Sequence, residues 1–182
     1  MKFIFKFFIY IIFFIYMLLI FLPKENLYYF GLEKLKSQKV ELTQDNIIDN
    51  HIGLLLNSIN IKYEGIDISN IDKINLSTYL FSSSLNIDNI KVDSSFNKFA
   101  PESIKFIKVN HSIIDPTNII IKSEFKLGRC DGVINLLTRT IKLNLVVSNK
   151  FKSKYRYIVK LLKKDKSKKS TKEEYYNYEY KF

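Results

Sequence analysis

The stretch FKLGRCDGVINLLTRTIKLNLVVS, Phe125–Ser148, carries the clearest pattern in the chain. Apolar and polar residues alternate through its last part, which places Ile141, Leu143 and Leu145 on one side. Alternation over about four to eight residues is typical of a half-buried β-strand. We interpret the stretch as a strand, a turn and two further strands, with the Asp131–Gly132 pair indicating a hairpin turn.

The same two-residue period extends outward over most of residues 39–150. It is visible in GIDIS, INLSTYLF, SIKFIKVN and NIIIKSEFKL, with Gly, Asn, Asp and Ser between the segments. An antiparallel sheet with one wet face has this pattern, and curvature or a second sheet must cover its apolar side. We therefore predict a mainly β protein in which 39–150 forms a curved antiparallel β-sheet or a sandwich-like domain. Thr43–Gly53 interrupts the pattern and is expected to form a helical turn or a loop.

The N-terminal segment, residues 1–23, is strongly apolar. Lys6 is the only charged residue between Phe3 and Leu22, and about 20 apolar residues are enough for a helix to cross a bilayer. The run ends in MLLIFLPKEN, which lacks the small residues of a signal-peptide cleavage site. We predict an uncleaved transmembrane signal anchor at 1–23, followed at 24–38 by a juxtamembrane linker that is a short helix, a membrane-surface segment or an irregular connection.

The basic residues that flank this segment bear on its orientation. Lys2, Lys6 and the amino terminus favour a cytoplasmic N-terminus, although Lys24 and Lys34 compete with them. We expect a single-pass protein of a bacterial inner membrane with the bulk of the chain in the periplasm.

The C-terminal segment, residues 151–182, holds most of the formal net charge of +11. Its YRYIVKLLKK part suits a basic amphipathic helix or a strand, and YYNYEYKF suits a closing strand. Lysines near a membrane gain about 1 kcal/mol each from anionic lipid, so this segment could lie on the membrane surface. The alternatives are a solvated loop and a nucleic-acid contact. We expect no nucleic acid, because a periplasmic tail would meet little of it. The candidate anionic-lipid contacts are Lys160, Lys163, Lys164, Lys168 and Lys169.

Motifs of enzymes and cofactor sites are absent from the sequence. Cys130 is the only cysteine, so neither an intramolecular disulfide nor a cysteine-based zinc site can form. His51 and His111 occur in unrelated contexts, and neither a G-x-S-x-G nor a P-loop is present. We therefore expect a non-enzymatic protein without cofactor or metal.

One family resemblance is carried by the stretch quoted first. Gly128, then Gly132–Leu136, then the alternating strand from Ile141 resembles the repeating pattern of AsmA-like proteins, and is similar also to the type II secretion system protein N. The resemblance implies an inner-membrane helix and a curved sheet whose apolar inner face holds lipid chains.

The side chains that would line such a groove are Ile121, Phe125, Leu127, Ile141, Leu143 and Leu145. The alternative is that they close an ordinary core. We therefore expect a structural, assembly or lipid-handling component of the cell envelope, with inner-membrane lipids and other envelope or secretion proteins as partners. The alternative is a membrane-tethered adaptor whose basic tail binds anionic lipid or a protein partner.

Overall fold

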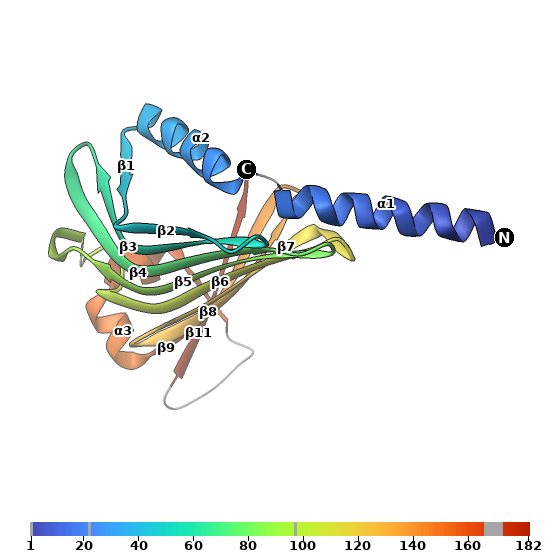
Figure 1. Ribbon diagram of the computed structural model, residues 1–182. Helices are drawn as coiled ribbons and strands as arrows, with labels where there is room; N and C mark the ends of the chain where they lie inside the picture. Colours follow the sequence, from blue (N-terminus) through green and yellow to red (C-terminus); the bar gives the residue numbers. More distant parts are fainter. Residues whose placement is uncertain (1, 22, 97, 166–172) are drawn as a thin grey trace.

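The computed structural model describes residues 2–21, 23–96, 98–165 and 173–182. These residues form a mainly β structure with two helices at the N-terminus and two short helices before the last strands (Figure 1). In chain order, the elements are α1 (Lys2–Phe21), α2 (Lys24–Ser37), β1 (Val40–Thr43), β2 (Asn46–Asp49), β3 (Gly53–Tyr63), β4 (Ile66–Thr78), β5 (Ser82–Val92), the 3₁₀ turn η1 (Ser94–Phe96), β6 (Ser103–Ser112), β7 (Asp115–Phe125), β8 (Gly128–Asn135), β9 (Thr140–Ser148), α3 (Asn149–Lys154), α4 (Arg156–Leu161), β10 (Lys163–Lys164) and β11 (Glu173–Lys181).

The strands of the described chain belong to one open, 11-stranded antiparallel sheet. Its order is β1-β3-β4-β5-β6-β7-β8-β9-β11-β10, and β2 pairs with the remaining part of β3. Successive strands from β3 to β9 are neighbours, so the sheet is a meander whose order follows the sequence. The sheet curls strongly from β2 round to β11 (Figure 1). The prediction of a mainly β, antiparallel and curved sheet is confirmed, and a single sheet takes the place of the sandwich alternative.

The two faces of the sheet differ in polarity, as the two-residue period predicts. On one face, Ile90 lies opposite Ile71 on one side and Ile104 on the other, and Ile104 in turn lies opposite Phe125. On the other face a polar row crosses the sheet through Asn86, Lys108, Lys122, Asp131 and Asn144. The apolar face is the inner, concave one, because its side chains converge into shared clusters while the polar ones diverge into solvent.

The alternation slips by one residue at the same level in four adjacent strands. In β3 the buried residues step from Leu56 to Ile59, and β4, β5 and β6 repeat this three-residue step. Ser58 and Asn89 have positive φ angles of 54° and 55° there, and the β6–β7 register shifts between Ile104 and Phe106. Irregularities of this kind bend strands and increase their twist, so the row of slips contributes to the curl of the sheet.

Two clusters of buried side chains line the concave face, and Ile104 packs against both of them. The first lies under α3 and α4 and holds Phe125, Leu145, Val147, Phe151, Tyr155 and Tyr176. The second lies towards α2 and holds Leu54, Leu56, Ile59, Ile71 and Ile90, with Tyr28 of α2 packed against it. Helices therefore cover parts of the concave face at two places, in addition to the curvature of the sheet itself.

Two local predictions were wrong. Asp131 and Gly132 lie inside β8, and the β7–β8 turn is formed instead by Lys126 and Leu127. The segment Thr43–Gly53, expected to be a helical turn or a loop, contains strand β2, whose Ile47 and Ile48 pair with Leu56 and Leu55. Pairing with the neighbouring β3 supplies the hydrogen bonds that a short helix of this length could not make for itself.

The N-terminal helices lie apart from the sheet or along its edge. The α1 helix projects away from the body, whereas α2 packs along β1, β2 and the start of β3 (Figure 1). The Tyr28 hydroxyl donates a 2.8 Å hydrogen bond to Gln44 Oε1, and burial raises the pKa of Tyr28 to about 12. Because Lys24–Ser37 form the helix α2, the short-helix alternative for the linker is confirmed. In the described part of the chain, no helix combines the length and the apolar character that membrane crossing requires.

The C-terminal segment returns to the sheet. Residues of α3 and α4 pack on the concave face, and β11 pairs with β9 along its whole length, from Glu173 opposite Ser148 to Lys181 opposite Thr140. In YRYIVKLLKK, Arg156–Leu161 are helical and Lys163–Lys164 form a short strand, so each of the two alternatives holds for a part of the segment. The closing strand is confirmed. Of the candidate lipid contacts, Lys168 and Lys169 lie outside the described residues.

Candidate functional site

The concave apolar face is the first of two features of the fold that could receive a ligand. We call the end of the sheet with the β4–β5, β6–β7 and β8–β9 turns the α1 end, because α1 joins the body there. The Lys24 Nζ, directly after α1, lies 3.6 Å from Asp49 Oδ1, and Asp49 lies opposite Leu54 near the start of β3. The opposite end, with the β3–β4, β5–β6 and β7–β8 turns, is called the far end.

The concave face is covered under α3 and α4 and again at β3 beside α2, and between these two places it is partly exposed towards the α1 end. Under α3 and α4, Val147 and Phe151 are each 1% exposed. Towards the α1 end, Leu85, Val109 and Ile121 are half-buried and Leu76 is 40% exposed. Because all of these residues lie on the same face, an apolar surface continues from the closed core out towards the α1 end.

The six predicted groove residues all lie on or next to the concave side of β7–β9. Leu143 and Ile121 both lie opposite Gly132 of β8, so the three form one row. Phe125 and Leu145 are buried in the cluster under α3, and Leu127 and Leu143 pack partly buried against it. Ile141 lies nearer the α1 end, opposite Ile134 and Tyr180. The structure therefore divides the set into residues of the closed core and residues that are half-buried.

The glycines of the opening stretch leave space above β8 for side chains of its neighbours β7 and β9. A Cβ atom at Gly132 would lie 2.5 Å from Leu143 Cδ2 and 3.7 Å from Ile121 Cβ. At Gly128 it would lie 2.4 Å from the Val146 backbone oxygen. Cys130, between the two glycines on the same face, is also small, and burial raises its thiol pKa to about 11. The concave side of β8 therefore makes room for the larger side chains of its two neighbours.

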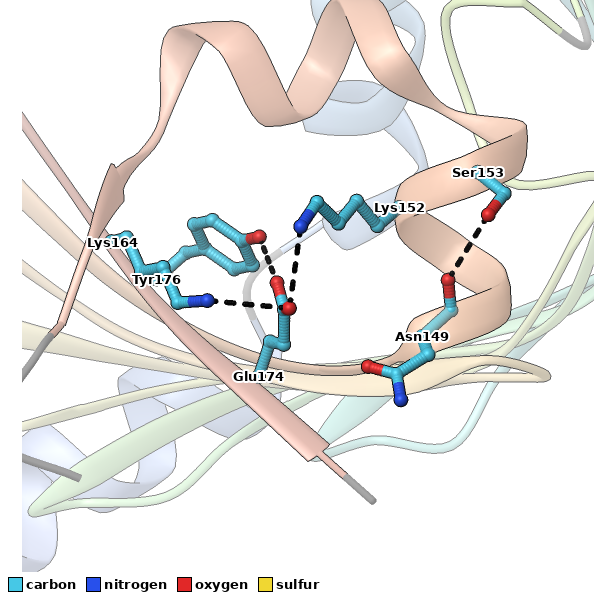
Figure 2. A network of polar contacts seen from close by, with 6 residues as sticks. All are labelled: Asn149, Lys152, Ser153, Lys164, Glu174 and Tyr176. Carbon is cyan, nitrogen blue, oxygen red and sulfur yellow. Dashed lines mark hydrogen bonds and ion pairs between the residues drawn. The ribbon is translucent and has the colours of Figure 1, made fainter. Parts of the chain in front are cut away.

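A polar network lies where α3 and β10 meet β11 (Figure 2). Tyr176 donates a hydrogen bond to the Glu174 carboxylate, which also forms ion pairs with Lys152 Nζ at 3.4 Å and Lys164 Nζ at 3.2 Å. The Glu174 side chain is 16% exposed. The hydrogen bond from Tyr176 and then the bonds from the two lysines hold the pKa of Glu174 below its usual range, while burial and the Glu174 contact raise the pKa of Tyr176 to about 12.

Beside this network is an open cleft of about 700 Å³. Its cations come from α3 and α4, where Arg156 and Lys160 are one helical turn apart. The lining residues are Asn149, Lys152, Ser153, Arg156, Val159, Lys160 and Glu174. Of the predicted lipid contacts, Lys160 therefore lines the cleft, Lys164 is tied to Glu174, and Lys163 lies exposed on β10.

Sequence reasoning missed the residues that dock the helices. Phe151 and Tyr155 are spaced as neighbours on one side of a helix, and their ring centroids lie 4.7 Å apart in the core. The sequence FKSKYRY, residues 151–157, shows this four-residue spacing, but lysines lie between the two aromatic residues and give the segment a charged character. Within the described residues, no cluster of His, Cys, Asp and Glu side chains suitable for a metal ion occurs.

Comparisons with protein-family models, with curated proteins and with solved structures found no match for this chain.

Proposed function

We propose that this chain is a non-enzymatic, membrane-attached component of the cell envelope that holds apolar lipid chains against the concave face of its sheet. The observation that carries the proposal is the continuous apolar face, closed under α3 and partly exposed from Ile121 and Leu143 towards the α1 end. An ordinary core would be closed along its whole length, because partly exposed apolar area forfeits roughly 25 cal/mol per Å². The resemblance to AsmA-like proteins and to protein N agrees with this proposal.

Membrane attachment is assigned to α1 as a single-pass signal anchor, with the sheet on the periplasmic side of a bacterial inner membrane. In support of this, the apolar run of the sequence extends from Phe3 to Leu22, and the apolar side chains of α1, from Phe3 through Phe13 to Phe21, are exposed. An aqueous helix with such a surface is unfavourable, whereas a bilayer would bury it. Alkaline carbonate extraction of the full chain decides between an integral protein and one that is only peripherally bound, and a reporter fused after Phe182 decides the orientation.

Photo-crosslinking tests the lipid-binding proposal on adjacent residues of opposite faces. A photoreactive amino acid at Ile121 or Leu143 would lie on the concave face, and the matched controls Ile120 and Val133 lie on the convex face. In cells fed a labelled fatty acid, we expect labelled lipid adducts from the concave positions and none from the convex ones. Adducts from neither face would show that the concave face is a closed core, and equal adducts from both faces would show that it is no specific lipid site.

A second function is favoured by the open cleft at α3 and α4. Arg156 and Lys160 are exposed there and could bind an acidic partner or anionic headgroups, as a membrane-tethered adaptor would. The double variant Arg156→Glu, Lys160→Glu should abolish partner recruitment while leaving the fold intact. The control, Lys91→Glu with Lys108→Glu, makes the same change in net charge at exposed positions of the sheet. Unchanged recruitment in the first variant would remove the adaptor function.

A further inference from the structure

The turns at the α1 end of the sheet carry large apolar side chains that face solvent. In the β4–β5, β6–β7 and β8–β9 turns, their exposed fractions run from 47% for Leu136 to 89% for Ile114. We call this set the apolar rim; it consists of Tyr79, Phe81, Ile113, Ile114, Leu136 and Leu137. Large exposed apolar patches mark interaction sites in soluble proteins, whereas single scattered apolar residues do not, so it matters that these six belong to neighbouring turns at one end of the sheet.

Turn geometry does not account for these residues. Ile113 and Ile114 form the two-residue loop of the β6–β7 hairpin, between Ser112 and Asp115. Neither isoleucine has a positive φ angle, so the backbone of this turn does not require Gly, Asn or Asp. The two side chains are 60% and 89% exposed, so neither packing nor backbone conformation explains a pair of isoleucines here.

Backbone hydrogen bonds join the turns into one surface. The Ile113 N–H donates to the Phe81 carbonyl at 2.9 Å, which links the β6–β7 turn to the β4–β5 turn. The Leu136 N–H donates to the Thr117 carbonyl at 2.8 Å, which links the β8–β9 turn to the start of β7. The three turns are therefore linked to one another through the end of the sheet.

The far end of the sheet is mixed in character. Its turns contain Glu64, Asp93, Glu102 and Lys126 beside the exposed Ile66 and Phe99, and Glu102 pairs with Lys154 of α3. Every turn of the far end thus holds a charged residue, whereas the β4–β5 and β6–β7 turns, Tyr79–Phe81 and Ile113–Ile114, hold none. Because charged side chains are costly to place in a bilayer, the α1 end is the better suited to an apolar partner.

The position of α1 indicates which apolar partner the rim meets. The Lys24 Nζ, at the start of α2, donates to the Ile20 carbonyl of α1 at 3.3 Å and pairs with Asp49, which lies opposite Leu54 at the start of β3. The Thr78 N–H donates to the Ile52 carbonyl at 2.7 Å, which joins the β4–β5 turn to the same region. Figure 1 shows α1 leaving the body on the side to which these turns point. A surface that holds α1 would therefore lie against the rim as well.

We propose that the apolar rim inserts into the interfacial layer of the bilayer to which α1 attaches the chain, so that the partly exposed part of the concave face opens onto lipid. This inference rests on the proposed attachment through α1. It adds a second membrane contact and an orientation, in which the strands point at the bilayer and the far end points away from it.

Depth-dependent fluorescence quenching tests the proposal on the full chain in liposomes. Cys130→Ser removes the native cysteine, and an environment-sensitive fluorophore is then attached at Ile114→Cys or Leu137→Cys. The liposomes contain a lipid whose acyl chains carry a quencher close to the headgroup. The matched control is Lys126→Cys, because Ile114 and Lys126 flank the two ends of β7 and lie roughly 40 Å apart at about 3.3 Å per residue. A third label, at Phe13→Cys, reports on α1.

We expect the rim labels to lose most of their fluorescence and to shift to the blue, with the Lys126 label unchanged. Rim labels without quenching, while the Phe13 label is quenched, would overturn the rim and leave the attachment through α1 standing. A Phe13 label without quenching would overturn the attachment itself. Quenching of the Lys126 label alone would overturn the orientation. A blue shift of the rim labels without quenching would overturn the lipid contact and assign the rim to a protein contact.

Discussion

The substitution Phe151→Ala tests whether α3 is part of the core or a separate tail. Phe151 is 1% exposed, and its ring centroid lies 5.4 Å from that of Phe125 and 4.7 Å from that of Tyr155. Truncating a buried Phe to Ala costs about 3–5 kcal/mol, because transfer free energy is lost and a cavity remains. We expect the free energy of unfolding to fall by this amount, since α3 is too short to persist without its packing.

Urea denaturation followed by far-UV circular dichroism and by tyrosine fluorescence measures this loss. With a slope of about 2 kcal/mol per molar urea, the midpoint should fall by roughly 1.5–2.5 M. The control is Tyr157→Ala in the following helix, where the removed side chain is 62% exposed and the expected change is about 0.5 kcal/mol or less. Equal midpoints for the two variants would refute the assignment of α3 to the core.

The same variant carries a functional expectation. Leu145 lies in the cluster that Phe151 covers, so a photoreactive group at Leu145 should give no lipid adduct in the native chain. If lipid occupies the concave face, uncovering the far end with Phe151→Ala should allow an adduct at Leu145 in the fraction that stays folded. An unchanged result would confine any lipid to the part of the face nearer α1.

Three further predictions follow from the interior of the sheet. Because the folded-state pKa of Tyr176 is raised to about 12, this tyrosine contributes stability that is present below its ordinary pKa of 10 and is lost as pH rises from 10 to 12; Tyr176→Phe should therefore make urea midpoints fall less steeply over that range. Gly128→Ala should cost about 1–3 kcal/mol, because its Cβ would lie 2.4 Å from the Val146 backbone oxygen. Gly132→Ala should cost less, because its tightest contact is the end of a flexible Leu143 side chain and the Lys142 backbone oxygen is 3.2 Å away; thermal unfolding compares the two. The Cys130 thiol, with a pKa raised to about 11, should react slowly with a maleimide at pH 7.5 and rapidly in urea.

The strands and their faces could be predicted because the two-residue period is a local signal. Alternation from Ile141 to Leu145 places these side chains on one face whatever the neighbouring strand is, and the structure has them there. The closing strand was recognisable in the same way, from alternating tyrosines such as Tyr176 and Tyr178. Even the slip in β3 left its mark, because the apolar residues step by three between Leu56 and Ile59.

The role of Asp131–Gly132 could not be predicted, because it is fixed by a different strand. An Asp-Gly pair satisfies a hairpin turn locally, but here Gly132 leaves space for Leu143 of β9, and that contact exists only after the sheet has formed. The β7–β8 turn at Lys126–Leu127 holds no Asn, Asp or Gly of its own, so its sequence gave little turn signal. The pairing of β2 with β3 is non-local in the same sense.

The apolar rim shows a second limit of pattern analysis. Ile113–Ile114 and Leu136–Leu137 have the composition of core residues, and only their position beyond the ends of paired strands places them in solvent. In the same way, the lysines around Phe151 and Tyr155 concealed two core residues in a segment that reads as a charged tail. Composition reports what a segment could bury, whereas topology decides where each residue lies.

The apolar rim and the open cleft at α3 and α4 cannot both contact the leaflet that holds α1. Glu174, beside the cleft, and Lys181, near the rim, lie at the two ends of β11, roughly 23 Å apart at about 3.3 Å per residue. Attraction between lysines and an anionic surface decays over a Debye length of about 8 Å at physiological salt. With the rim in the bilayer, Arg156 and Lys160 therefore gain almost nothing from that leaflet and remain available to an acidic partner in the aqueous space. The fluorescence pair at Ile114 and Lys126 thus decides between two orientations as well as testing the rim.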